Sequence, residues 1–76
     1  MLSITEIVKD DILEIIFADK QNQQKCYTIL CEKGKEKMKG NISGFTQRTC
    51  LYIGELKKGK YKIQIDEQNI KYFEVV

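Results

Sequence analysis

The 76-residue chain has no proline, histidine or tryptophan, and it has no long apolar run. Without histidine, it lacks the commonest general base and the commonest zinc ligand of proteins. Its apolar runs are short, such as residues 15–18, whereas a membrane helix needs roughly 18 consecutive apolar residues. Residues 1–11 contain neither a basic leader nor an apolar segment. The sequence therefore predicts no membrane span and no signal peptide.

Cysteine is scarce too: Cys26, Cys31 and Cys50 are the only three. Zinc would need four cysteines, or three and an unusual oxygen ligand, so we expect no metal and no other cofactor. Cys26 and Cys31 lie five residues apart in a strand-like segment, which directs their side chains to opposite faces and prevents a mutual disulfide. Cys50 has the option of pairing with either, which would leave one odd thiol. We expect three reduced side chains in or near the core.

The composition is that of a folded chain, with 42% hydrophobic residues, 32% charged residues and a net charge of +2. Such a chain is too apolar and too weakly charged to be disordered. Its length predicts one small domain over residues 1–76. The charge is unevenly placed: residues 20–62 are strongly basic, and residues 1–19 and 63–76 are acidic. Either the middle presents a surface to a polyanion, or the acidic ends pack beside it and offset its charge.

Apolar and polar residues alternate with a period of two along most of the chain, which is typical of β-strands. In residues 60–66, for example, Tyr61, Ile63 and Ile65 alternate with polar residues. Glycine- and asparagine-rich turn signals separate such segments at intervals of about 8–12 residues. The expected strands span residues 3–9, 11–18, 24–31, 35–39, 48–55, 60–66 and 69–76. The apolar residues of segment 3–9 also have helical spacing, so a short helix is the alternative there. Segment 11–18 is apolar on both faces, which favours a central position in a sheet.

Seven short strands in one small domain predict an all-β fold, a small seven-stranded antiparallel sandwich of the immunoglobulin-like kind. A five-stranded barrel of the OB or SH3 kind is the alternative architecture. Because the core of so short a chain is small, the domain is expected to be marginally stable. An exposed final strand would offer an edge for association with another chain.

One motif carries a resemblance to a known family. Residues 56–65 read LKKGKYKIQI, which is Leu-x-x-Gly-x-Tyr followed by alternating apolar residues. This pattern resembles the corner before the penultimate strand in immunoglobulin-like and fibronectin type III-like sandwiches. The resemblance implies a structural corner in which the Tyr61 hydroxyl bonds back to the turn at residues 56–58. Leu56 would then fill the core, and Gly59 would allow the tight bend.

A second segment extends the resemblance. Residues 27–35 read YTILCEKGK, a strand followed by a Gly-Lys turn at Gly34 and Lys35. The order of elements over residues 12–76 resembles the small C-terminal β-sandwich domains of Bacteroidetes secreted proteins, which include the type IX secretion sorting tails. Those domains are noncatalytic, and their motif residues are structural. The resemblance implies a secreted or cell-surface location, whereas a native start at Met1 implies a cytoplasmic one.

Candidate catalytic groups are few. Asp10-Asp11 and Asp66-Glu67 are adjacent carboxylates at turn-like positions, where solvated side chains are the ordinary case; calcium could use them only if the two turns met in space. Arg48 precedes Cys50 by two residues and would share its strand face, but no histidine is present to activate the thiol. The scattered glycines form no phosphate-binding motif. We therefore expect a protein that is not an enzyme.

Two functions from different classes remain. The first is a noncatalytic immunoglobulin-like module that engages a protein or glycan partner. The second is a small basic β-barrel that binds single-stranded nucleic acid, with five aromatic rings available for stacking. Its basic surface would consist of Lys33, Lys35, Lys37, Lys39, Lys57, Lys58, Lys60 and Lys62, and its rings would be Tyr27, Phe45, Tyr52, Tyr61 and Tyr72. A buried Tyr61 favours the first function, and exposed rings between lysines favour the second. Mimicry that inhibits a host enzyme is a third class, without a sequence signature.

Overall fold

The period-two alternation produces eight β-strands in the computed structural model, which describes residues 2–76. No helix that could span a membrane occurs among these residues. Short turns connect the strands, as the turn signals predict. In chain order the strands are β1 (Leu2–Ile4), β2 (Ile7–Val8), β3 (Ile12–Phe17), β4 (Lys25–Cys31), β5 (Glu36–Ile42), β6 (Arg48–Tyr52), β7 (Gly59–Ile65) and β8 (Asn69–Val75).

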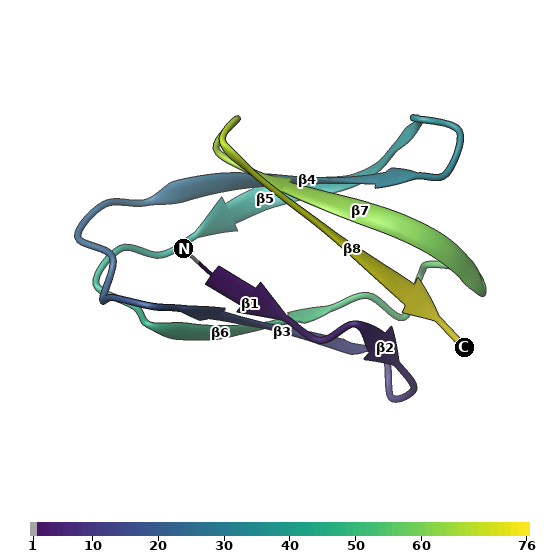
Figure 1. Ribbon diagram of the computed structural model, residues 1–76, viewed down its shortest axis with the longest axis horizontal. Helices are drawn as coiled ribbons and strands as arrows, with labels where there is room; N and C mark the ends of the chain where they lie inside the picture. Colours follow the sequence, from purple (N-terminus) through teal and green to yellow (C-terminus); the bar gives the residue numbers. More distant parts are fainter. Residues whose placement is uncertain (1) are drawn as a thin grey trace.

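The strands form two sheets that lie face to face (Figure 1). One sheet has the order β1-β3-β6, and the other has the order β2-β8-β7-β4-β5. The predicted all-β fold of two packed sheets is therefore confirmed. The strands do not close into the barrel that was the alternative, because β3 and β6 pair with each other and with no strand of the larger sheet.

The prediction of seven antiparallel strands needs two corrections. There are eight strands, and β2 runs parallel to β8. The single strand expected over residues 3–9 is divided, since its first half pairs with β3 and its second half with β8. The division falls at Thr5, whose N–H donates to the carbonyl of Glu14 at 3.1 Å and whose Oγ1 accepts from the Glu14 N–H at 3.1 Å. The next residue, Glu6, already bonds to the other sheet, because its carbonyl accepts from the Glu74 N–H at 2.8 Å.

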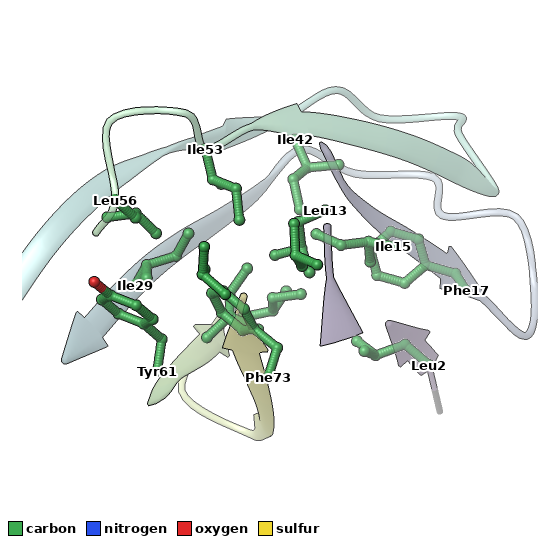
Figure 2. Close-up of a cluster of buried hydrophobic side chains, with 14 residues drawn as sticks. Leu2, Leu13, Ile15, Phe17, Ile29, Ile42, Ile53, Leu56, Tyr61 and Phe73 are labelled. Atoms are coloured by element: carbon green, nitrogen blue, oxygen red, sulfur yellow. The ribbon is translucent and has the colours of Figure 1, made fainter. Parts of the chain in front are cut away.

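The core lies between the two sheets and is apolar throughout (Figure 2). No polar or charged residue of the described chain is buried. The alternation in β3 and β7 directs every second side chain inward, so that Leu13, Ile15, Ile63 and Ile65 have no exposed surface. The buried set is Leu2, Val8, Leu13, Ile15, Phe17, Ile29, Ile42, Ile53, Leu56, Tyr61, Ile63, Ile65, Phe73 and Val75. Burial of this set is the main stabilising contribution to the fold.

The strand β5 extends further than its sequence predicts. Residues 40–44 carry two glycines and an asparagine and read as a loop, yet β5 continues through Gly40 and Asn41 to Ile42. Gly40 is the register partner of Tyr27 in β4, and a Cβ at Gly40 would lie 3.0 Å from the Tyr27 ring. The ring thus covers the glycine, and this cross-strand contact maintains the strand where propensity alone would end it.

Candidate functional site

The larger sheet has one face in the core and one face toward solvent. In β7 the inward residues are buried, so Lys60, Lys62 and Gln64 point to the opposite side. The register of β8 and β4 places further side chains beside them: Tyr72 and Leu30 flank Lys62, and Ile70 flanks Gln64. We call the solvent-facing side chains of this sheet the outer face, and its members are Ile7, Cys26, Thr28, Leu30, Lys39, Asn41, Lys60, Lys62, Gln64, Ile70, Tyr72 and Glu74.

Apolar side chains are prominent on the outer face. Tyr72 is 70% exposed, Ile7 is 49% exposed and Ile70 is 44% exposed, while Leu30 is half-buried. Aromatic and branched aliphatic side chains surrounded by charged residues are typical of protein interaction surfaces. Sequence reasoning missed this set as a surface. The signal was available in β8, where Ile70 and Tyr72 have the opposite parity to the core residues Phe73 and Val75.

The lysines of the two basic segments are brought partly together. Because Cys31 pairs with Tyr61, the β4–β5 turn that carries Lys33 and Lys35 lies at the same end of the sandwich as the start of β7. Lys57 and Lys58 precede β7 at that end, and Lys39, Lys60 and Lys62 lie on the outer face. Lys37 is exposed beside a β-bulge, where the register shifts between Ile29 and Leu30. The eight lysines therefore form a band over the larger sheet and one end of it.

Neutralisation by the acidic ends of the chain is limited. Among residues 2–76 two ion pairs occur, Lys25–Asp66 at 2.8 Å and Arg48–Glu14 at 2.5 Å. Each joins a base from the middle of the chain to an acid from one end. Neither includes a lysine of the two basic segments. The acidic ends thus offset only part of the charge, and the lysine band keeps a net attraction for anionic groups.

The corner residues Leu56, Gly59 and Tyr61 lie together where the chain enters β7. The Tyr61 hydroxyl donates to the carbonyl of Lys57 at 2.7 Å. The Tyr61 ring is 8% exposed and stacks on Phe73, with 5.6 Å between the ring centroids. Leu56 is buried beside it (Figure 2). Gly59 has φ +153°, a conformation that L side chains rarely adopt. These three residues are structural, because they face the core or shape the backbone.

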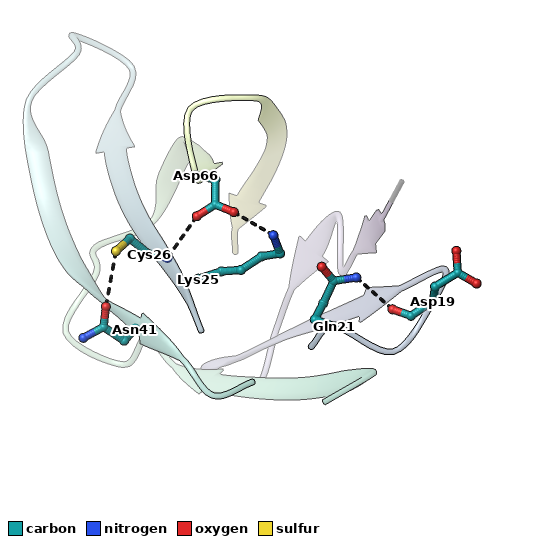
Figure 3. A network of polar contacts seen from close by, with 6 residues as sticks. All are labelled: Asp19, Gln21, Lys25, Cys26, Asn41 and Asp66. Atoms are coloured by element: carbon teal, nitrogen blue, oxygen red, sulfur yellow. Dashed lines mark hydrogen bonds and ion pairs between the residues drawn. The ribbon is translucent and has the colours of Figure 1, made fainter. Parts of the chain in front are cut away.

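A polar hollow of about 630 Å³ lies where the β7–β8 turn meets β4. Cys26, Thr28, Gln64, Asp66, Glu67 and Gln68 line it. Asp66 fixes the turn, because its carboxylate accepts from Lys25 Nζ at 2.8 Å and from the Cys26 N–H at 3.3 Å (Figure 3). The Lys25 hydrogen bond lowers the pKa of Asp66 below its ordinary value, although partial burial opposes this. The lining has no aromatic ring on which a sugar could stack.

The two carboxylate pairs do not form one site. Asp10 and Asp11 follow β2, whose residue Val8 pairs with Val75 near the start of β7. Asp66 and Glu67 follow the end of β7, seven residues further along the strand. At about 3.3 Å per residue the two pairs are roughly 20 Å apart. Within residues 2–76, no three His, Cys, Asp or Glu side chains are grouped in a way that could hold a metal ion.

All three cysteines are free thiols in the described structure. Cys26 and Cys31 fall on opposite faces of β4, with Cys26 exposed and bonded to Asn41 Oδ1 at 3.4 Å, and Cys31 packed against the core. Desolvation raises the pKa of Cys31, but hydrogen bonds with the backbone of Lys35 and Lys33 and the charge of Lys37 outweigh it, so the pKa is lowered.

Cys50 is exposed and shares its strand face with Arg48, yet the guanidinium binds elsewhere. Arg48 Nε donates to Glu14 Oε2 at 2.6 Å. The cation that could have activated the thiol is therefore engaged by a carboxylate across β3 and β6. This arrangement offers the Cys50 sulfur no dedicated partner for nucleophilic chemistry.

No protein-family model matches the chain, and no curated protein is similar to it in sequence. A functional interpretation therefore depends on the arrangement of the residues themselves.

Proposed function

We propose that the protein is a noncatalytic, immunoglobulin-like binding module that engages a protein partner through the outer face. The observation that carries this proposal is the set of exposed apolar side chains Ile7, Ile70 and Tyr72, which lie on one face beside Lys60, Lys62 and Glu74. Such a mixture provides apolar area for the centre of an interface and charge for its rim. A standard interface buries about 800 Å² on each partner. With a total surface of 5362 Å², most of one sheet face would be used.

The immunoglobulin-like assignment is supported by strand order and by the corner. Immunoglobulin constant-type sandwiches have strands A, B, E and D in one sheet and strands C, F and G in the other. Here β1, β3 and β6 form the first sheet, and β4, β7 and β8 are neighbours in the second. The Tyr61 hydroxyl bonds four residues back, as in the tyrosine corner of that fold. These features also agree with the resemblance to Bacteroidetes C-terminal β-sandwich domains, which we propose as the nearest family type.

A protein partner is favoured over a glycan. Glycan sites need rings over which sugars stack, and the polar hollow beside Asp66 has none. The exposed Tyr72 lies instead beside Lys62 and on the same face as Ile70, so its neighbours present apolar surface and positive charge. A partner with apolar and acidic side chains would match this surface in both respects.

The experiment compares two tyrosine-to-alanine variants. Tyr72→Ala removes the central ring of the outer face, and Tyr52→Ala removes a similarly exposed ring from the other sheet. Both variants and the wild type serve as bait for proteins of the cell that makes this chain, and each captured partner is then purified and titrated by calorimetry. We expect a partner whose affinity falls roughly thirtyfold with Tyr72→Ala and is unchanged with Tyr52→Ala. Equal affinity for all three baits would contradict the proposal.

Binding of single-stranded nucleic acid is the second candidate. One observation favours it: Tyr72 is the register partner of Lys62, which places an exposed ring beside an ammonium group that forms no ion pair. The test is fluorescence anisotropy with labelled single-stranded RNA and DNA at low and moderate salt. Micromolar affinity with a steep inverse salt dependence, lost in Lys60→Glu/Lys62→Glu, would replace the protein-binding proposal. Absence of binding at low salt would eliminate this candidate.

A further inference from the structure

We infer that the free edge of β5 takes up an extended acidic segment of a partner protein as an added strand. This inference rests on the proposed binding function, and it names the element and the partner chemistry involved. β5 is the last strand of its sheet and pairs only with β4. An unpaired strand edge presents a row of N–H and C=O groups to which another chain can bind.

The direction of the backbone groups follows from β4. The Cys26 carbonyl accepts from the Asp66 N–H on the β7 side, whereas the Cys31 N–H donates to Lys35 on the β5 side. Odd-numbered residues of β4 therefore turn their backbone toward β5, where Tyr27 faces Gly40 and Lys25 faces Ile42. The intervening residues Lys39 and Asn41 turn theirs outward. Among residues 2–76, none of the backbone hydrogen bonds outside the strand ladders uses the N–H or C=O of these two residues.

The side chains of the edge specify what could bind. Lys39 points to the outer face, Lys37 is exposed beside it, and neither has an ion-pair partner among residues 2–76. On the inner side the edge is apolar, since Ile42 is buried and Met38 packs against the core. An added strand would place alternate residues on these two sides. Its outward residues should therefore be acidic and its inward residues apolar.

The lysines also discriminate between partners. Lysine on an edge strand usually prevents aggregation, because a second copy of the same strand would bring like charges together. The same charge attracts a strand of alternating acidic and apolar residues. The edge of β6 is a weaker candidate. It is shorter, the Arg48 carbonyl already accepts from Thr46 Oγ1 at 3.0 Å, and the Arg48 charge is paired with Glu14.

The test uses two synthetic peptides of about nine residues, each acetylated and fluorescently labelled. In the acidic peptide Glu alternates with Val, and in the basic peptide Lys replaces every Glu. We expect the wild-type protein to bind the acidic peptide and not the basic one. Lys39→Glu should weaken binding of the acidic peptide roughly tenfold. Amide hydrogen exchange at Lys39 and Asn41 should slow when the acidic peptide is bound.

Two further variants separate strand addition from simple charge attraction. Lys39→Ala removes the charge and keeps the N–H, whereas Lys39→Pro removes both, at an edge position whose N–H does not serve the β4–β5 ladder. We expect binding to be weaker in Lys39→Pro than in Lys39→Ala. The matched charge control is Lys9→Glu, because Lys9 is exposed and directly follows β2, at the opposite edge of this sheet and about 19 Å from β5. It should weaken binding less than twofold.

Several outcomes would overturn the inference. Equal binding of both peptides, equal affinity of Lys39→Ala and Lys39→Pro, or an equal loss with Lys9→Glu and Lys39→Glu would each exclude strand addition at β5. These outcomes leave the proposed function intact if a partner still depends on Tyr72. If the acidic peptide adds to β5 and no partner depends on Tyr72, the outer-face proposal fails and the strand-addition site remains.

Discussion

The hydrogen bond from Tyr61 to Lys57 gives the sharpest prediction about stability. Tyr61→Phe deletes one oxygen and preserves the ring, so the stacking on Phe73 and the burial of the side chain are unchanged. The bond is short, at 2.7 Å, and only partly buried. Because Lys57 is exposed, its carbonyl can bind water after the substitution, which avoids the full penalty of an unsatisfied buried acceptor.

The magnitude follows from these facts. A partly buried neutral hydrogen bond contributes about 0.5–1.5 kcal/mol net, and we expect a loss of about 1 kcal/mol for Tyr61→Phe. A domain of this length has a free energy of unfolding of about 4–11 kcal/mol. For a domain of about 60–100 residues, a loss of 1 kcal/mol lowers Tm by about 4–8 °C.

The assay is equilibrium unfolding in urea, monitored by two spectroscopic probes so that two-state behaviour is verified. The midpoint should fall while the slope stays constant, because the surface exposed on unfolding is unchanged. Tyr52→Phe is the matched control, since Tyr52 is 65% exposed and its hydroxyl forms no hydrogen bond in the described structure; it should lie within about 0.5 kcal/mol of wild type. If both variants unfold at the same midpoint, the corner hydroxyl does not stabilise the fold and the reasoning is wrong.

Three further predictions concern the corner, the core and the β7–β8 turn. Gly59→Ala should lower the free energy of unfolding by more than about 1 kcal/mol, because φ is +153° at this residue. If the variant unfolds in urea at the wild-type midpoint, the backbone relaxes and the prediction is wrong. Leu13→Ala should cost about 2–5 kcal/mol in the same assay, since the side chain is fully buried, and a smaller cost would mean that the core collapses around the cavity. The lowered pKa of Asp66 means that its bond with Lys25 stabilises the fold above the unfolded-chain pKa, near 4, and that this is lost as pH falls through the folded pKa. Asp66→Asn should therefore flatten the dependence of the urea midpoint on pH below about 4, and an unchanged acid limb would refute the assignment.

The features that the sequence predicted well depend on short-range alternation. In β7 the parity of Tyr61, Ile63 and Ile65 identified three core residues and, by exclusion, the outward lysines. In β3 both faces are apolar, so alternation alone did not show that Leu13 and Ile15 face the core whereas Ile16, on the other side, is 40% exposed. Alternation indicates which residues share a face of a strand, but it does not show which of two apolar faces packs against the other sheet.

The features that the sequence could not predict depend on pairing between distant segments. The first strand is divided because Glu6 bonds to Glu74 and Ser3 pairs with Ile16. The local composition of residues 3–9 predicts neither pairing. The outer face forms only when β8 pairs with β7, because Tyr72 and Lys62 lie in different strands. The persistence of β5 through Gly40 likewise depends on a ring from another strand.

The crossing of the first segment between the sheets has a consequence for how the molecule would resist a pulling force. Strands β2 and β8 are the second and the last strands, and they run parallel. A load applied to the two chain ends would therefore draw β2 backward and β8 forward along their common axis. The hydrogen bonds between them, among them Glu74 N–H to Glu6 at 2.8 Å and Val76 N–H to Val8 at 3.0 Å, would bear this load in shear and break together rather than one after another. Tension between the termini would thus load this short pair in shear, together with the β1–β3 pair that lies between it and the N-terminus.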